Sequence, residues 1–223
     1  MRLIALRHGQ ASFGSDDYDQ LSPLGAQQCE QAGRWLARHG HDFTRVVRGG
    51  HRRHQQSLAA LSRGFALEGG RLPAEEVDAD FNEFDHQSVV AAFLARHPPR
   101  AADTAPGPAL ARLLADALHA WASGQLGPPA ESWPDFRRRT RGAGARLHAQ
   151  SEGGSTLLVT SAGVLAQLAA EALAAPDDRA VELNLQIRNA AMVELEAKSD
   201  GWRMASWNAL PHLADQRSSW TYL

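Results

Sequence analysis

The sequence contains a single cysteine, Cys29, so a disulfide bond within the chain is excluded. It also lacks any apolar run near the ~20 residues with which a helix spans a bilayer. The first residues have no apolar stretch of the length found in signal peptides. Because proteins of reducing compartments do without disulfides, these absences lead us to expect a cytoplasmic protein.

The chain has almost no excess of charge of either sign. Its 23 Lys and Arg residues face 25 Asp and Glu residues, for a formal net charge of −2. This balance argues against nucleic acid or a membrane surface as a partner. A length of 223 residues suits one α/β domain over residues 1–223. A homodimer is left open.

Strands alternate with helices along the chain, which is typical of a parallel sheet built from βαβ units. Short apolar runs predict strands at 3–6, 44–48, 72–79 and 155–160, with later strands at 189–195 and 202–207. Amphipathic spacing predicts helices at 22–40, 51–65 and 162–174. In the first helix, Ser22 is a suitable N-cap and Pro23 suits the first position. We therefore expect a three-layer α/β/α fold with a mostly parallel sheet and helices on both faces.

Residues 86–150 depart from this alternation. They are rich in alanine and helical in pattern, and Pro and Gly residues interrupt them at 98–108 and 127–134. We expect a helical insertion over the functional site, within the same domain.

The first predicted strand runs directly into Arg7-His8-Gly9. In an open α/β sheet, ligands bind just beyond the carboxyl ends of the strands, where Arg7 and His8 would lie. Gly9 allows the backbone to turn sharply or to approach a ligand closely. A histidine beside an arginine at this edge suggests a nucleophile aimed at a phosphoryl group. The tripeptide occurs by chance, so its weight depends on the residues that accompany it.

Those residues follow in a characteristic order. The LSPLGAQQ segment opens a helix, an arginine lies in a second strand–turn–helix unit, and Asn82-Glu83 follow a third strand. In this order they resemble the histidine phosphatase superfamily, with its phosphoglycerate-mutase-like fold. The resemblance covers most of the chain outside 86–150. It implies a cofactor-independent phosphatase for a small phosphorylated substrate, in which His8 becomes a phosphohistidine.

The chemistry of His8 and Arg7 agrees with this implication. An imidazole with an ordinary pKa near ~6.5 is mostly neutral at pH 7, and nearby arginines lower the pKa further. The planar guanidinium of Arg7 matches the spacing of two phosphate oxygens.

The resemblance also implies a second phosphate-binding arginine. The family pattern is similar to S-x-L-x-R-A-x-Q-T, and residues 49–57 read GGHRRHQQS here. Arg53 takes the arginine position, and Gly49 stands where the pattern has serine. Arg52 is an alternative that better suits a solvated helix face, and Arg48 is a third candidate from the end of its strand.

Glu83, within the sequence FNEFD, matches the acid of the family. The resemblance implies that it protonates the leaving oxygen and then activates water, because the second step reverses the direction of proton transfer. Asp85 is the local competitor for this role.

The second histidine of the family follows the fourth strand, in a pattern similar to T-H-G-G. Residues 160–163 read TSAG here, so Ser161 stands in its place. That histidine helps to stabilise charge on the transferring group. Ser161 and the N–H of Ala162, at a helix N-terminus, could bind an anion instead. His212, just after the last strand, is our candidate substitute.

Two further departures favour hydrolysis over mutase chemistry. Gln10 stands where the mutases usually have glutamate, and Gly14 stands where many relatives have asparagine. The mutase segments after Glu83 are also not recognisable. We expect no bound metal, because the pairs His39/His41 and His51/His54 lack a carboxylate in a metal-binding pattern.

Two other functions are compatible with parts of the sequence. The order Ser161, Asp177 or Asp178, then His212 matches that of an α/β-hydrolase, although Val159 stands where the G-x-S-x-G elbow needs glycine. This hypothesis leaves Arg7 and His8 without a role. Alternatively, the chain is a phospho-ligand binding module that has lost its chemistry.

Overall fold

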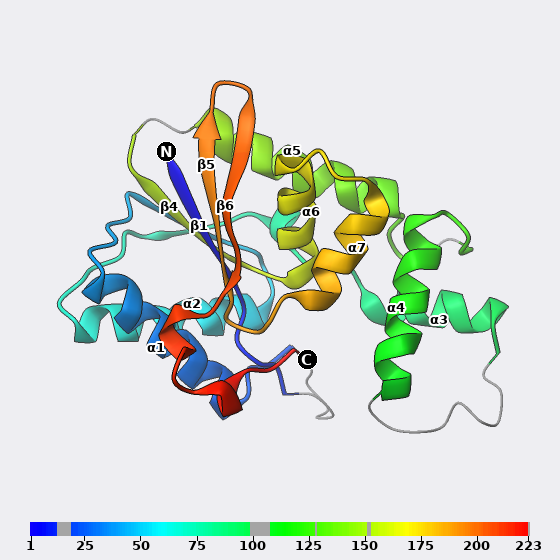
Figure 1. Cartoon of the computed structure of the whole chain (residues 1–223), viewed down its shortest axis with the longest axis horizontal. Helices are drawn as coiled ribbons and strands as arrows, with labels where there is room; N and C mark the ends of the chain where they lie inside the picture. The colour runs from blue at the N-terminus through cyan, green and yellow to red at the C-terminus, as the bar shows by residue number, and fades with distance from the viewer. Residues whose placement is uncertain (13–18, 99–107, 128, 151–152, 223) are drawn as a thin grey trace.

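A computed structural model describes residues 1–12, 19–98, 108–127, 129–150 and 153–222, and Gly14 lies outside them. One mixed sheet crosses the molecule in the order β3-β2-β4-β1-β5-β6 (Figure 1). Its strands are β1 (Arg2–Arg7), β2 (Arg45–Arg48), β3 (Glu75–Val77), β4 (Ser155–Thr160), β5 (Met192–Lys198) and β6 (Gly201–Ala209). The first four strands pair in parallel, whereas β5 pairs antiparallel with both β1 and β6.

Helices cover both faces of this sheet. They are α1 (Pro23–Arg38), α2 (Arg52–Leu67), α3 (His86–Arg96), α4 (Pro108–Ala122), α5 (Trp133–Ala149), α6 (Ala162–Ala172) and α7 (Asp177–Gln186). The described residues also form the 3₁₀ turns η1 (Ala79–Phe81), η2 (Pro211–Leu213) and η3 (Arg217–Ser219).

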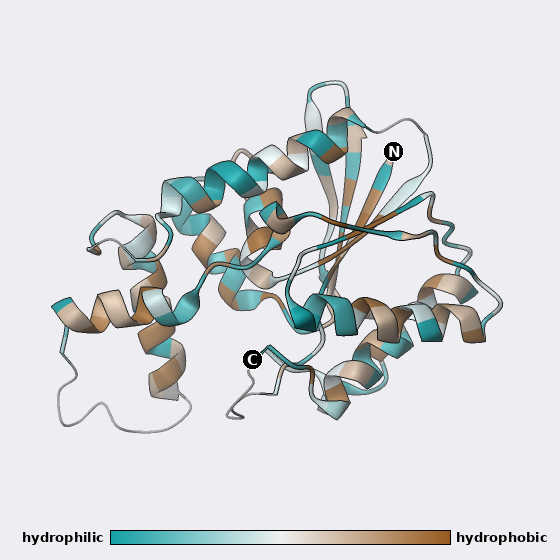
Figure 2. Cartoon of the chain, turned by 180° about the vertical axis from the view of Figure 1, so that it is seen from behind, coloured by the Kyte–Doolittle hydropathy of each residue, from teal (hydrophilic) through white to brown (hydrophobic). Residues whose placement is uncertain are grey.

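The strands form the middle layer because their successive residues enter different cores. Leu3 and Ala5 of β1 belong to the core shared with α3 to α7, whereas Ile4 and Leu6 belong to the core shared with α1 and α2. Alternation along a strand buries both faces in this way. Figure 2 shows apolar colour along the strands and hydrophilic colour on much of the outer surface of the helices. The expected three-layer α/β/α fold with a mostly parallel sheet is confirmed.

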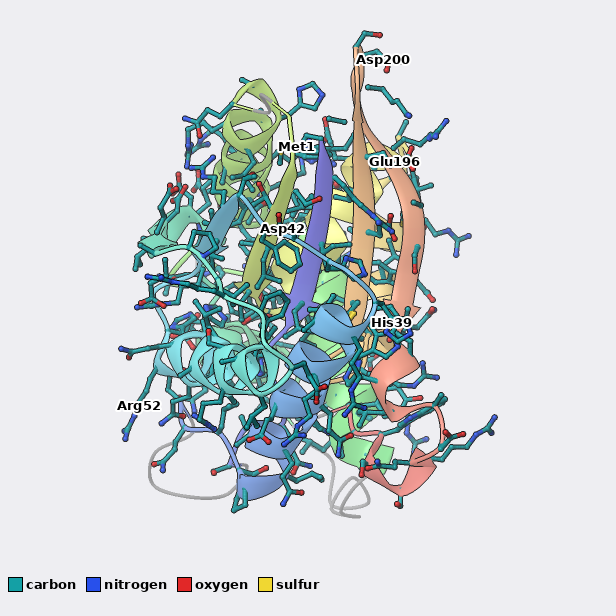
Figure 3. The ribbon with its side chains drawn as sticks, turned by 90° about the vertical axis from the view of Figure 1, so that its left-hand side faces the viewer. Met1, His39, Asp42, Arg52, Glu196 and Asp200 are labelled. Atoms are coloured by element: carbon teal, nitrogen blue, oxygen red, sulfur yellow. The ribbon has the colours of Figure 1, made fainter. Side chains whose placement is uncertain are left out.

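Three strands bring their carboxyl ends to one edge of the sheet. Arg7 pairs in register with Thr160 at the end of β4, and Arg48 of β2 pairs with Val159. The N–H of His8 then donates to the carbonyl of Thr160 at 2.8 Å. Figure 3 shows Met1 and Asp200 toward one end of the sheet and Arg52 toward the other. Residues that follow β1, β2 and β4 therefore meet at a single edge.

The turn from β1 into α1 depends on two glycines. A Cβ added at Gly9 would lie 2.2 Å from the carbonyl oxygen of Gly25, and one added at Gly25 would lie 2.1 Å from that of Gln10. Ser22 caps α1, as predicted, because its side chain accepts from the N–H of Gly25, with Pro23 at the first position.

The last described residues are tied to α1 and to the segment before β5. The Gln28 amide donates to the carbonyl of Ser219 at 2.7 Å. The N–H of Asn189 donates to the carbonyl of Thr221 at 2.8 Å, and the N–H of Ala190 donates to that of His8 at 3.0 Å. The neighbouring residues Asn189 and Ala190 therefore connect the C-terminal segment to the backbone of His8.

Some elements differ from the sequence-based prediction. The strand expected at 72–79 is only Glu75–Val77, and the exposed side chains of β3 explain its weak apolar signal. The strand expected at 189–195 begins at Met192, and α7 was not predicted. Within 86–150, α3 and α4 pack on each other, whereas α5 packs against α6 and β6 and so belongs to a layer that covers the sheet. In the described part of the chain, no helix combines the length and apolar character needed to cross a membrane.

Candidate active site

His8 lies immediately beyond β1 at this edge and is 5 % exposed. Its Nδ1 lies 2.7 Å from the carbonyl oxygen of Gly9. Since a carbonyl can only accept, Nδ1 carries the proton and Nε2 keeps its lone pair in the neutral ring. Burial, followed by the charges of Arg53 and Arg7, holds the pKa of His8 well below its usual value. The imidazole is therefore neutral at pH 7, as a nucleophile must be.

Two buried arginines stand beside His8. Arg7 is anchored by a bond from Nη1 to the carbonyl of Ile187 at 2.5 Å. Arg53, in the first turn of α2, is 7 % exposed, and its Nη1 lies 2.7 Å from Oδ1 of Asp19. The charges of both guanidinium groups act on His8. They supply the cationic fork that a phosphoryl group requires.

A role for Asp19 was not predicted from the sequence. Its Oδ2 accepts from the backbone N–H of Arg52 at 2.8 Å, in addition to the bond of Oδ1 to Arg53. This carboxylate both caps the start of α2 and orients Arg53. Asp19 is one of several acidic residues in the polar segment before α1, and no sequence pattern there predicts a contact with α2.

Glu83 approaches the site from the turn after η1. Its Oε2 accepts from the N–H of Gly163 at 2.9 Å, and its Oε1 accepts from the N–H of Phe84 at 3.3 Å. Burial of the carboxyl raises its pKa, while the Gly163 hydrogen bond and the charges of Arg53 and Arg7 oppose the rise. The arginines that act on His8 thus also act on Glu83. Asp85 instead caps α3 through the N–H groups of Gln87 and Ser88.

The turn from β4 into α6 brings Ser161 to the same place. Ser161 is fully buried at the N-cap of α6, yet its hydroxyl makes no capping bond. Its Oγ lies 2.7 Å from Nε2 of His54 and 3.5 Å from Nη2 of Arg53. Ala162 begins α6 next to it. The structure therefore brings together Arg7, His8, Arg53, Glu83 and Ser161, from segments far apart in the sequence.

The contact between Ser161 and His54 also went unpredicted. His54 follows Arg53 on α2, has no exposed surface, and its ring centroid lies 5.9 Å from that of His8. Burial, then the charges of Arg53 and His51, hold its pKa well below the usual value. The available signal was a histidine at the position where the family pattern has alanine.

The other predicted candidates lie elsewhere. Arg48 pairs with Glu75 of β3 at 2.9 Å, and Arg52 is exposed and points away from the molecule (Figure 3). His212, in η2, is half-buried, and its two ring nitrogens are covered yet have no hydrogen-bond partner among the described residues. In the part of the chain that the structure describes, no hydrogen bond therefore joins the ring of His212 to Arg7, His8, Arg53, Glu83 or Ser161.

The hydrolase order Ser161, Asp177 or Asp178, then His212 does not form a triad. Ser161 bonds to His54, Asp177 pairs with Arg137 at 2.7 Å, and Asp178 accepts from the N–H of Arg179. This arrangement is therefore wrong as a serine-hydrolase site. Within the described ranges, no three His, Cys, Asp or Glu side chains are grouped so that they could hold a metal ion.

The assembled residues can perform one kind of chemistry well. A neutral imidazole with a free Nε2 faces a site with two guanidinium groups, and a carboxyl with a raised pKa lies within the same field. This combination pairs a nucleophile with an anion-binding fork and a proton donor.

Several solved structures resemble the whole chain in fold. The chain shares 25 % identity with a mycobacterial glucosyl-3-phosphoglycerate phosphatase, over 93 % of this chain and 98 % of that one, with a TM-score of 0.63. A phosphoserine phosphatase variant from Entamoeba histolytica, solved with phosphoserine, shares the fold at 14 % identity, with coverages of 95 % and 98 % and a TM-score of 0.66.

A phosphoglycerate mutase from Bacillus anthracis also shares the fold, at 13 % identity and a TM-score of 0.68, over 97 % of this chain and 96 % of that one. No protein with a curated description matches the sequence. The family model of the histidine phosphatase superfamily, branch 1, matches residues 3–210. The chain therefore belongs to branch 1 of the histidine phosphatase superfamily.

Proposed function

We propose that this protein hydrolyses a phosphomonoester through a phosphohistidine intermediate on His8. The observation that carries the proposal is that His8, Arg7 and Arg53 are buried at one edge of the sheet, where Arg53 reaches Ser161 in the turn after β4 and the N–H of Gly163 in that turn holds Glu83. The nucleophile and the proton donor therefore share one anion-binding field. A phosphoryl group held by the two arginines would lie between them.

In the first step, the Nε2 lone pair of His8 attacks phosphorus while the bond from phosphorus to the ester oxygen breaks. The leaving oxygen takes the proton of the Glu83 carboxyl, so the alcohol departs neutral. Burial supports this role because it raises the pKa of Glu83 and favours the acid form. The guanidinium groups of Arg7 and Arg53 balance the charge on the phosphoryl oxygens.

In the second step, the Glu83 carboxylate accepts a proton from water as the water oxygen attacks phosphorus. The bond between Nε2 and phosphorus breaks, its electron pair returns to the ring, and inorganic phosphate leaves. Because Nδ1 of His8 donates to the carbonyl of Gly9, Nε2 is the nitrogen that reacts in both steps.

The substrate class follows from the family. The relatives described above act on small phosphorylated molecules, namely a glucosyl phosphoglycerate and phosphoserine. We infer a small phosphorylated substrate for this chain as well.

The first test compares the wild type with His8→Ala on p-nitrophenyl phosphate, with EDTA present in both reactions. We expect wild-type turnover that disappears in the variant, together with loss of the acid-labile phosphoryl label on the protein. Full activity of His8→Ala would overturn the proposal. If neither protein turns substrate over, tight vanadate binding by the wild type would select a phospho-ligand binding module instead.

A further inference from the structure

The imidazole of His54 has no part in the two steps above, although it lies beside the proposed nucleophile. It is fully buried, and its ring centroid is 5.9 Å from that of His8. A buried imidazole loses its hydration, so its ring nitrogens need hydrogen-bond partners within the protein, and these partners show what the ring can position.

The partner of His54 is Ser161. Nε2 of His54 lies 2.7 Å from Oγ of Ser161, across 107 residues of sequence. Nη2 of Arg53 lies on the same oxygen at 3.5 Å. Ser161 is an N-cap residue whose hydroxyl does not cap its own helix. The hydroxyl therefore faces the anion-binding arginine and the imidazole instead of the helix backbone.

A third position completes the arrangement. A Cβ at Gly49 would lie 2.4 Å from Nδ1 of His54. The ring can occupy its present place only because residue 49 has no side chain. The family pattern has serine, alanine and histidine at positions 49, 54 and 161, whereas this chain has glycine, histidine and serine. His54 contacts both of the other two positions, so the three departures are sterically linked.

We propose that the second active-site histidine of this protein has moved to position 54, from which it holds the hydroxyl of Ser161 toward the transferring phosphoryl group. This inference rests on the proposed phosphatase function. Ser161 is then the catalytic residue that touches the phosphoryl oxygen, and His54 is its positioning residue.

This division of roles includes one assignment: the neutral ring of His54 carries its proton on Nε2. With that tautomer, Nε2 of His54 and Nη2 of Arg53 both donate to Oγ of Ser161. Its own hydroxyl proton then has no acceptor in this cluster and is left for a phosphoryl oxygen. A fixed donor of this kind, in a site that excludes water, is worth far more than the same group in solution.

The experiment is a set of four variants at the two positions. His54→Phe fills the ring space without a donor, Ser161→Ala removes the hydroxyl, and the double variant removes both. The fourth, His54→Ala with Ser161→His, returns an imidazole to the turn after β4. For each we would measure kcat/KM on p-nitrophenyl phosphate, the Kd for vanadate, phosphoryl labelling and the melting temperature.

We expect His54→Phe and Ser161→Ala each to lower kcat/KM by on the order of 10²-fold. The double variant should lose no more than either single one, because the two residues act as a unit. The exchanged pair should regain at least about tenfold over His54→Phe, as one donor of this kind is worth that much. Vanadate affinity should follow the same order.

Additive losses, or wild-type kcat/KM in a folded His54→Phe, would overturn the inference. So would a folded exchanged pair without recovery. If the exchanged pair does not fold, the inference is judged on whether the kcat/KM losses of the two single variants add up in the double variant. Wild-type labelling on His8 separates the outcomes: with labelling present, only the role of His54 fails, whereas its absence means that the proposed function fails.

Discussion

At the scale of single residues, the site depends on two shifted pKa values. Burial and the charges of the two arginines lower the pKa of His8, and burial raises the pKa of Glu83. The same buried surroundings therefore favour a neutral nucleophile at His8 and the acid form of Glu83.

Glu83→Gln should therefore lower kcat/KM on an alkyl phosphate by about 10²–10⁴-fold. The loss on p-nitrophenyl phosphate should be much smaller, because its leaving group needs little protonation. The parameter kcat/KM is chosen because it reports the steps up to phosphoryl transfer and not the later hydrolysis. Equal losses on both substrates would contradict the assignment of Glu83 as the acid.

The pH profile provides an independent check on Glu83. Its acid form is required, so wild-type kcat/KM on an alkyl phosphate should fall as the pH rises through the raised pKa of Glu83, above 4.5. The fall on the acidic side, from protonation of His8, should come well below pH 6.5, because the pKa of His8 is lowered. In Glu83→Gln the basic fall should be absent.

At the scale of elements, the chemistry depends on short turns after β1, β2 and β4. These turns were predictable in outline, because aliphatic runs ending at Arg7, Arg48 and Thr160 mark buried strands. The α7 helix was missed although Pro176, Asp177 and Asp178 provide a helix-start signal. In the sequence, the same acidic residues also fit the order of an α/β-hydrolase, which obscures their role at the start of this helix.

The candidate site was predictable only where local motifs carry it. Arg7, His8, Arg53 and Glu83 each stand in a recognisable short pattern. The Ser161–His54 contact joins residues 107 apart in the sequence, and the Asp19–Arg53 contact joins residues 34 apart. Such contacts depend on how α2 packs beside β4, which no short pattern specifies.

The turn from β4 into α6 provides a test at this scale. A Cβ at position 163 would lie 2.4 Å from Oε1 of Glu83 and 2.8 Å from Cε1 of the buried Phe84, so both side chains would have to shift. We expect Gly163→Ala to fold with a lowered melting temperature and a displaced acid.

Its kcat/KM should therefore fall more on an alkyl phosphate than on p-nitrophenyl phosphate. Gly142→Ala is the matched control, because Gly142 also lies in a helix and a Cβ there would meet only Arg146 Nη1, at 3.8 Å. A loss that is the same for both substrates would show that the carboxyl had not been displaced selectively.

At the scale of the whole molecule, the buried histidines make stability depend on pH. Burial lowers the pKa of His212 to about 3, against an unfolded value of 6.5. The unfolded chain therefore binds a proton at this position below pH 6.5, while the folded chain does not until about pH 3. Stability is full above pH 6.5 and declines as the pH falls through that window.

Between pH 7 and pH 5, His212 alone should lower the free energy of unfolding by about 2 kcal/mol. His212→Leu removes the titrating group from an environment that offers it no partner among the described residues. Urea unfolding at the two pH values should show a smaller difference for the variant than for the wild type, by that amount. Equal differences would mean that His212 does not carry this linkage.

The hydrogen bonds of the C-terminal segment have a practical consequence for any surface-based assay of this protein. The backbone of Asn189 and Ala190 holds Thr221 on one side and His8 on the other. Met1 lies at the opposite end of β1, where its carbonyl accepts from Ala197. A bead, dye or sensor chip coupled near Thr221 would pull on the peptide that supports the proposed nucleophile. Coupling at the amino end would not load the Asn189-Ala190 peptide.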